Sequence, residues 1–219
     1  GYYIDALTIV MFVMVTLVAS CIHVYSFGYM HEELHEVTDS LATTSGGRPL
    51  LRRGRFHRFY QYLSLFCFSM LGLVVAGNIA MVFVFWELVG LCSYLLIGFY
   101  IERRSASDAA NKAFIVNRVG DFGMLVGLMV IWSTLGTFSF GDVHAADGTA
   151  AEAGIFSQVR PPERNHELVV PEGMVEAAAR EEIARIVMQQ PDPAAARAEI
   201  ASRITDWRER GYGYGLLML

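Results

Sequence analysis

Long apolar runs, separated by short polar segments, occupy the first two thirds of the chain. Across residues 59–101 the only charged side chain is Glu87. A helix needs about 20 mostly apolar residues to cross the hydrocarbon layer of a bilayer. Runs of about this length predict transmembrane helices at residues 4–27, 59–76, 79–101 and 112–135. The pattern therefore predicts an all-α fold, a polytopic membrane helix bundle of about four transmembrane helices within residues 1–140.

The pattern changes after residue 140. Residues 141–210 are rich in Ala, Glu, Arg and Pro. We expect a loop to about residue 170, then an amphipathic helix over residues 172–188. A second helix is expected to begin with Asp192 as its N-cap and Pro193 at its first position. One face of this second helix carries apolar residues at helical spacing: Ala196, Ile200, Ile204 and Trp207.

This segment is therefore predicted to be a soluble helical insertion, a hairpin that lies on the membrane domain or docks a partner. The apolar residues 211–219 that follow it are interpreted as the start of a further membrane helix. The chain begins without a methionine and stops inside this apolar stretch, so we expect it to be a segment of a longer protein.

Positive charge gathers in two of the loops between the predicted spans. The loop over residues 28–58 contains five arginines: Arg48, Arg52, Arg53, Arg55 and Arg58. The loop over residues 102–111 contains Arg103 and Arg104. Loops rich in Lys and Arg stay on the cytoplasmic side of a membrane. The two loops are therefore predicted to be cytoplasmic, and residues 141–210 to be extracytoplasmic.

Composition supports a membrane protein and gives no sign of redox chemistry in this chain. Hydrophobic residues make up 54% of it, and the mean hydropathy is +0.38. The three cysteines lie inside apolar runs at spacings that fit no zinc or haem motif: Cys21, Cys67 and Cys92. The sequence has no phosphate-binding loop, no dinucleotide fingerprint and no CxxC pair. We therefore expect no cofactor-binding residues and no metal site here.

Glu87 is the strongest candidate functional residue. It lies eight residues past the predicted helix start at Ile79, which places it about 12 Å along the helix. A carboxylate at that depth needs a partner, a water-filled cavity or a proton, because its insertion costs at least a few kcal/mol. Gly90 on the same helix face lets a neighbouring helix approach closely. Proton or ion handling is the leading hypothesis, and a structural acid between helices is the alternative.

Three further polar residues lie in or beside the fourth predicted span. Arg118 and Asp121 are three apart on one helix, so they share a face and can pair. Such a pair is either a structural salt bridge near the interface or part of a relay. Lys112 comes about one and a half turns earlier. It is predicted to be an interfacial lysine, or to present its ammonium group to a buried acid.

Histidines offer a weaker set of candidates. Residues 31–35 spell H-E-x-x-H, the zinc-binding pattern of metalloproteases. However, the run begins just past the first predicted span and has no clear third ligand beyond the candidates Glu36 and His57. A zinc protease is thus disfavoured relative to adventitious metal binding. His23, near the end of the first span, is interpreted as an interfacial residue rather than a proton relay.

Two long blocks resemble a known family. The stretches are FWELVGLCSYLLIGFY (85–100) and NKAFIVNRVGDFG (111–123). They are similar to the large antiporter-like membrane subunit of respiratory NADH:quinone oxidoreductase, or complex I, of the subunit L type, equivalent to mitochondrial subunit 5. The resemblance covers roughly residues 1–33 and 55–140, whereas loop 34–54 and insertion 141–210 are longer than the family pattern needs.

The resemblance implies a role for each candidate in proton translocation. Glu87 corresponds to the key intramembrane glutamate of the family and Asp121 to a functional aspartate, with Arg118 and Lys112 in the same motif. In the family, the glutamate works against a lysine on a later, broken helix, which is expected beyond residue 219. Electron transfer drives the protons, and its NADH, FMN, iron–sulfur clusters and quinone are expected in other subunits.

The resemblance also implies the partners and the location of the protein. The expected partners are other membrane-arm subunits and the lipid bilayer, with no nucleic acid, and the expected location is a bacterial inner (plasma) membrane. Two alternatives remain open. One is the homologous subunit of a multisubunit cation/proton antiporter, a membrane hydrogenase or a bicarbonate-uptake system. The other is a structural membrane fragment that pumps nothing.

Overall fold

The chain forms two compact units, residues 1–124 and residues 125–219. The computed structural model describes residues 2–43, 46–144, 150–162, 167–190 and 192–217. Its secondary structure is mostly helical, which confirms the predicted membrane helix bundle with a helical insertion.

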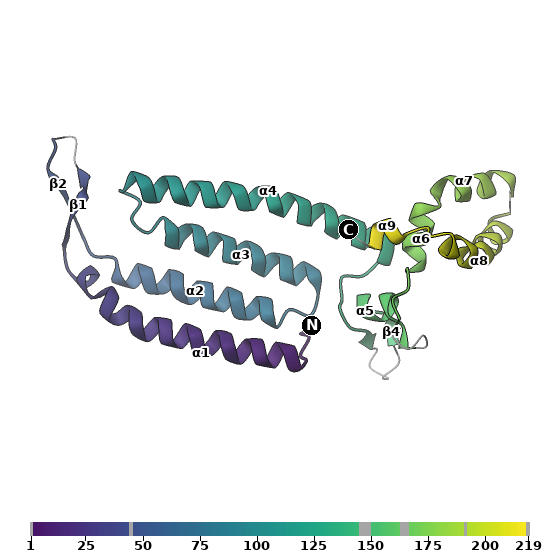
Figure 1. Cartoon of the computed structure of the whole chain (residues 1–219), viewed down its shortest axis with the longest axis horizontal. Coiled ribbons are helices and arrows are strands. Elements are labelled where there is room, and N and C mark those ends of the chain that lie inside the picture. The colour runs from purple at the N-terminus through teal and green to yellow at the C-terminus, as the bar shows by residue number, and fades with distance from the viewer. Residues whose placement is uncertain (1, 44–45, 145–149, 163–166, 191, 218–219) are drawn as a thin grey trace. The chain divides into compact units, whose positions relative to one another are not determined.

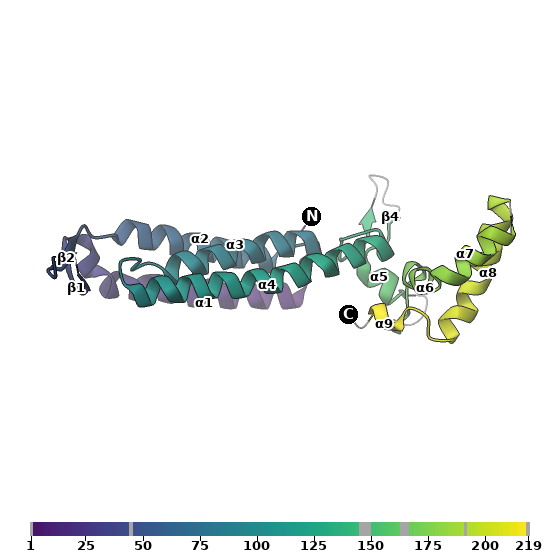
Figure 2. The same ribbon diagram turned by 90° about the horizontal axis from the view of Figure 1, so that it is seen from above.

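The first unit is built on long helices that lie side by side (Figure 1). They are α1 (Ala6–Tyr29), α2 (Phe56–Val74), α3 (Ile79–Ile97) and the first part of α4 (Arg104–Leu135). α1 packs on α2 and α2 packs on α3. The view from above shows the same helices running along a common direction (Figure 2). α4 begins eight residues before the predicted span at Lys112, because its polar first two turns are helical too.

Side-chain caps fix where two of these helices begin. Asp5 accepts a hydrogen bond from the backbone N–H of Thr8 at 2.7 Å, which satisfies a donor that the first turn of α1 leaves free. Asn78 does the same for Met81 at 2.7 Å at the start of α3. Gly72 of α2 allows the close packing of α2 on α3, since a Cβ atom there would lie 2.2 Å from the ring of Phe85.

Within the described residues, three helices are long and apolar enough to cross a membrane: α1, α3 and α4. α2 is as long as α3, but its first turns carry His57, Arg58 and Gln61. The helix predicted at residues 59–76 is therefore present, while its crossing of the membrane stays a prediction.

A β-hairpin occupies the loop between α1 and α2. After the short 3₁₀ helix η1 (His31–Leu34), strand β1 (Val37–Thr43) pairs antiparallel with β2 (Pro49–Arg52). Opposite pairs include Val37 with Arg52 and Asp39 with Leu50. The sequence pattern predicted no strand here, because the segment lacks the alternation of apolar and polar residues that marks a half-buried strand.

Ion pairs join this hairpin to η1, and join the hairpin and the start of α2 to the connection between α3 and α4. Glu33 accepts two hydrogen bonds from Arg52, at 2.7 and 2.6 Å, and both side chains are buried. Arg103 donates to Asp39 at 2.9 Å. Arg55 pairs with Glu102 and also donates to the backbone oxygen of Phe99 at 3.2 Å.

The arginines also shift the protonation of these acids. Hydrogen bonds from the guanidinium groups hold the pKa of each carboxyl group below its ordinary value, Glu33 through Arg52, Asp39 through Arg103 and Glu102 through Arg55. These ion pairs thus hold the described parts of the two arginine-rich loops together at this end of the bundle.

The second unit contains the remaining described elements. They are β3 (Val143–His144), β4 (Ala150–Glu152), α5 (Ile155–Val159), α6 (Glu172–Ala178), α7 (Arg180–Gln189), α8 (Pro193–Glu209) and α9 (Tyr214–Leu217). α6, α7 and α8 surround one apolar core. Its buried members are Val170, Met174, Val175, Ala179, Ile186, Ala196, Ile204 and Trp207.

The predicted hairpin is confirmed in its second helix and wrong in its first. Asp192 caps α8 by accepting from the N–H of Ala194 at 3.1 Å, and Pro193 is the first helical residue. Of the predicted apolar face, Ala196, Ile204 and Trp207 are buried and Ile200 packs against them. The helix expected over residues 172–188 is instead broken at Ala179, whose backbone (φ −91°, ψ 15°) leaves the helical range.

A buried tryptophan is satisfied by an acid in the same unit. Glu182 of α7 accepts from Trp207 Nε1 at 2.7 Å and from the Tyr212 hydroxyl at 2.7 Å. These bonds lower the pKa of Glu182. The apolar segment 211–219, predicted to begin a membrane helix, contains the short helix α9, and its residues 218 and 219 lie outside the described residues, as do 145–149, 163–166 and 191 of the insertion.

Candidate functional site

Glu87 lies on the third turn of α3 and faces α4. Its Oε2 atom forms an ion pair with Nη1 of Arg118. Both side chains are half-buried, with 24% of Glu87 and 35% of Arg118 exposed. The apolar sequence around Glu87 predicted that it needs a partner, and the structure supplies one from the next helix.

Arg118 also contacts a second carboxylate. Its Nε atom lies 3.1 Å from Oδ2 of Asp121, which confirms the predicted pair on α4. Asp121 is buried and accepts a hydrogen bond from Trp86 Nε1 at 3.2 Å. One guanidinium group thus bridges a glutamate of α3 and an aspartate of α4.

The cluster keeps unused hydrogen-bonding capacity. Among the described residues, the buried Oε1 atom of Glu87 has no hydrogen-bond partner. The contact between Arg118 Nε and Asp121 Oδ2 has ion-pair distance without the alignment of a hydrogen bond. A carboxylate oxygen in this state can accept a proton or a water molecule without first breaking a protein hydrogen bond.

Small and aromatic residues make room for the guanidinium group. A Cβ atom on Gly90 would lie 3.3 Å from Arg118 Nη2, so glycine allows the arginine to reach α3. The guanidinium carbon also lies 4.9 Å from the centre of the Phe114 ring, a cation–π contact. Beside the cluster is a cavity of about 230 Å³. It is lined by Trp86, Val89, Gly90, Ser93, Asn117, Arg118 and Asp121.

The fourth predicted site residue stands apart. Lys112 is exposed on α4, and in the described part of the chain it forms no ion pair. It lies six residues before Arg118, which is about 9 Å along the helix. The structure therefore brings together three of the four predicted residues, and the role of Lys112 stays a prediction.

The pairing of Glu87 with Arg118 was missed in the sequence. The sequence did contain a signal for this pair. Each residue places a charge in an apolar helix, where insertion into the membrane costs free energy. The two charges are opposite, and the two helices follow one another in the chain. Two such residues are expected to neutralise each other. The spacing of three on α4 predicts only the pair of Arg118 with Asp121, and the resemblance to the family implies a lysine as the partner of Glu87.

The histidine run does not form the helix of a zinc protease. η1 ends at Leu34, and His35 has an extended backbone (φ −115°, ψ −177°). Glu33, inside the motif, is bound by Arg52. Among the residues that the structure describes, no group of three or more His, Cys, Asp or Glu side chains is placed to hold a metal ion. His23 Nδ1 lies 2.8 Å from the backbone oxygen of Ala19.

Chemically, the cluster is one permanent cation between two titratable anions. An arginine stays protonated at any physiological pH, so the charge of the cluster changes only at its carboxyl groups. With both carboxylates ionised the net charge is about −1, and one added proton makes the cluster neutral. The arrangement thus places one cation between two carboxyl groups, one on α3 and one on α4.

Comparisons with known proteins match most of the chain. Residues 76–158 match the family described as NADH:quinone oxidoreductase/Mrp antiporter, TM. Residues 1–36 match the family described as NADH-ubiquinone oxidoreductase (complex I), chain 5 N-terminus. The glutamate, arginine and aspartate of the cluster all lie inside the first match.

Individual relatives agree with these families. The NAD(P)H-quinone oxidoreductase chain 5 of Synechocystis sp. is 43% identical over 157 residues, which cover 72% of this chain and 20% of that protein. The chloroplastic NAD(P)H-quinone oxidoreductase subunit 5 of Mesostigma viride is 46% identical over 140 residues, 64% of this chain and 18% of the relative. The chloroplastic subunit 5 of Anthoceros angustus is 47% identical over 141 residues, which cover 64% of this chain and 16% of that protein. The chain spans about a fifth of the length of these relatives.

Proposed function

Since the chain belongs to the chain 5 family of antiporter-like membrane subunits of complex I, we propose that it forms part of a proton-translocating membrane subunit of an NAD(P)H:quinone oxidoreductase. The redox groups of such an enzyme, NADH, FMN, iron–sulfur clusters and quinone, belong in this proposal to other subunits. The chain contributes a proton site and the helices that hold it in the membrane.

The observation that carries the proposal is the bridge from Arg118 to both Glu87 and Asp121. While both carboxylates are ionised, the single guanidinium group leaves one negative charge uncompensated in an apolar surrounding. Uptake of a proton at Glu87 removes that charge, and its free Oε1 atom is the place for the proton. Asp121, held by Trp86 and Arg118, keeps the guanidinium group in place meanwhile.

Release of the proton needs a change in the charge near Glu87. A cation that approaches Glu87 favours its ionised form, and a cation that withdraws favours the protonated form. In the family this cation is the lysine of a later helix, and Lys112 is a second candidate on the present chain. Electron transfer elsewhere in the complex would move that charge, and the Arg118–Asp121 pair would feed or gate the proton.

The replacement Glu87→Gln tests this proposal directly. Glutamine keeps the shape and a hydrogen-bond acceptor for Arg118 but cannot carry the proton. In the assembled oxidoreductase reconstituted into vesicles, we expect proton pumping driven by NAD(P)H oxidation to fall to background while assembly is unchanged. The measurement is the ratio of protons moved to electrons transferred.

The matched control is Glu181→Gln, which neutralises an exposed carboxylate of α7. It should pump normally. A normal ratio of protons to electrons in Glu87→Gln would refute the relay role of Glu87 and leave it a structural acid.

One observation favours a second candidate function. The family matched by residues 76–158 is described as including the Mrp antiporter as well as the oxidoreductase. A subunit of a cation/proton antiporter would exchange Na⁺ for protons without any electron donor. Sodium-driven acidification of vesicles in the absence of NAD(P)H would favour the antiporter, whereas pumping that requires NAD(P)H and is independent of Na⁺ favours the oxidoreductase.

A further inference from the structure

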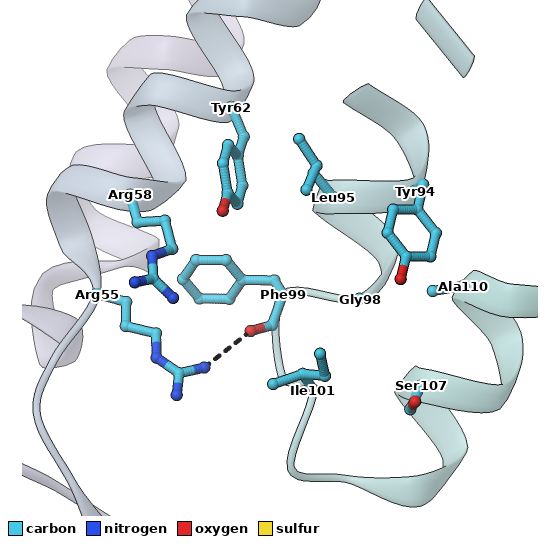
Figure 3. Close-up of a pocket in the computed structure, with 10 residues that line it drawn as sticks. All are labelled: Arg55, Arg58, Tyr62, Tyr94, Leu95, Gly98, Phe99, Ile101, Ser107 and Ala110. Atoms are coloured by element: carbon cyan, nitrogen blue, oxygen red, sulfur yellow. Dashed lines mark hydrogen bonds between the residues drawn. The ribbon is translucent and has the colours of Figure 1, made fainter. Parts of the chain in front are cut away.

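A second cavity lies at the arginine-rich end of the bundle, away from the Glu87 cluster. Its volume is about 100 Å³. Figure 3 shows the side chains that surround it, which come from the start of α2, the end of α3, the connection that follows and the start of α4. The lining residues are Arg55, Arg58, Tyr62, Tyr94, Leu95, Gly98, Phe99, Ile101, Ser107 and Ala110.

The cavity has a cation without a counter-charge. Arg52, Arg55 and Arg103 at this end of the bundle are each paired with an acid. Arg58, by contrast, is exposed, and within the described ranges it forms no ion pair. In Figure 3 its guanidinium group lies next to the edge of the Phe99 ring, above the side chain of Arg55. The positive charge of Arg58 is therefore available to an anion.

Neutral donors complete the lining. Tyr62, Tyr94 and Ser107 line the cavity with hydroxyl groups. Among the residues described, none of the three hydroxyl groups donates to another protein group. Leu95 and Ile101 provide an apolar side, and Ile101 is 59% exposed. An anion with an apolar extension matches this combination of charge, donors and apolar surface.

We propose that this cavity binds the phosphate group of an anionic phospholipid. Arg58 supplies the charge, the hydroxyl groups of Tyr62, Tyr94 and Ser107 donate to phosphate oxygens, and the acyl chains lie along the apolar side. The position supports a lipid rather than a free anion, because the cavity lies at the end of the helix bundle where arginines gather and is flanked by the exposed apolar side chain of Ile101. Basic pockets between membrane helices are typical headgroup sites on the cytoplasmic side.

The test compares binding of defined anions to the purified full chain in a neutral detergent. Phosphatidylglycerol is titrated in, and binding is followed by the rise in the unfolding temperature and by native mass spectrometry. Phosphatidylcholine and inorganic phosphate are titrated in parallel. We expect phosphatidylglycerol to bind more tightly than either, and Arg58→Gln to weaken it about fivefold, the effect of one arginine near a lipid surface.

Arg53→Gln is the matched control. It removes an exposed arginine five residues away that does not line the cavity, and it should leave phosphatidylglycerol binding unchanged. Tyr94→Phe, which removes only a hydroxyl group, should weaken binding less than Arg58→Gln while preserving the fold.

Three outcomes would overturn the proposal. Equal weakening by Arg58→Gln and Arg53→Gln would mean that only the overall surface charge attracts the lipid. Unchanged binding in Arg58→Gln would mean that the cavity is not the site. Inorganic phosphate that binds as tightly as phosphatidylglycerol would assign the cavity to a free anion instead of a lipid.

Discussion

At the scale of single residues, Arg118 is the side chain on which the candidate site depends. A guanidinium group presents several N–H donors in a planar fork, so one side chain can serve two carboxylates on different helices. Arg118 does so by contacting Glu87 through Nη1 and Asp121 through Nε. A lysine has the same charge, but its side chain is shorter and ends in a single ammonium group.

The replacement Arg118→Lys is therefore expected to keep the charge and lose one of the two contacts. A charge-assisted hydrogen bond contributes about 1.5–3 kcal/mol, so proton translocation should fall roughly tenfold or more. The measurement is the initial rate of NAD(P)H-driven proton uptake in vesicles. Arg104→Lys, an exposed arginine at the start of α4, is the control. Equal rates in the two variants would contradict the bridging role.

The buried pair of Glu33 and Arg52 makes a prediction about pH. Arg52 holds the pKa of Glu33 below its ordinary value of 4.5. A carboxyl group with a lowered pKa stabilises the fold fully above its ordinary value, and this contribution is lost as the pH falls through the lowered pKa. Glu33→Gln should destabilise the chain by about 3–5 kcal/mol at pH 7, because it leaves the Arg52 charge buried without a partner.

The unfolding temperature in detergent checks this expectation. The gap between the wild type and Glu33→Gln should be wide at pH 7 and shrink below pH 4.5. A gap that stays constant from pH 7 to pH 3 would show that the charge of Glu33 does not stabilise the loop. Leu34, the exposed neighbour of Glu33, offers the control Leu34→Ala, which should leave the pH dependence unchanged.

Residue by residue, the sequence predicted which side chains place charge in the apolar helices better than which of them meet. Glu87 and Asp121 were identified by their charge in apolar helices, and the Arg118–Asp121 pair by its spacing of three. The bridge between α3 and α4 could not be read from spacing, because it depends on how the two helices are rotated against each other. Gly90 was predicted to let a neighbouring helix approach, and in the structure it makes room for the side chain of Arg118.

At the scale of elements, the starts of helices are marked by short polar side chains. Asn78 begins α3 and Asp192 begins α8, and both accept a backbone hydrogen bond from the first turn. The sequence predicted the Asp192 cap because Pro193 follows it. It could not predict the break at Ala179 or the β1–β2 hairpin. Alanine is a good helix former, so the break at Ala179 comes from packing. The β1–β2 hairpin is held by ion pairs to residues that are distant in the sequence.

Asp192→Ala should loosen the start of α8. Loss of an N-cap costs about 1 kcal/mol, so the amides of the first turn should exchange with solvent about fivefold faster. Hydrogen exchange of Ala194 and Ala195 measures the effect. Glu209→Ala at the other end of the helix removes the same charge without removing a cap, and it should leave this exchange unchanged. Equal exchange in Asp192→Ala and the wild type would contradict the capping role.

At the scale of the whole molecule, the distribution of arginines predicts which side of the membrane each loop faces. The ion pairs of the hairpin with the α3–α4 connection place both arginine-rich loops at one end of the bundle, as two cytoplasmic loops require. Residues 141–210 are predicted to lie on the opposite side. The number of membrane crossings follows from the length of the helices, whereas the orientation depends on charge alone.

Labelling of single cysteines tests this orientation. Cys21, Cys67 and Cys92 are first replaced by alanine, and a cysteine is introduced at Arg104 or at Glu181, both of which are exposed. In intact cells an impermeant maleimide should label Glu181→Cys and not Arg104→Cys, and in inside-out vesicles the pattern should reverse. Labelling of both positions from the same side would disprove the predicted topology.

The composition of α2 has a consequence for how the protein is made. Unlike α1, α3 and α4, α2 lacks a stretch that is long and apolar enough to be recognised as a membrane span, because its first turns carry His57, Arg58 and Gln61. Only residues 75–78 separate it from the apolar helix α3, and Gly72 allows the two helices to pack closely. A weakly apolar segment enters the bilayer readily only when a partner segment shares the free energy of insertion. We therefore expect α2 to enter the membrane only once α3 has left the ribosome, so that the two helices integrate as one unit.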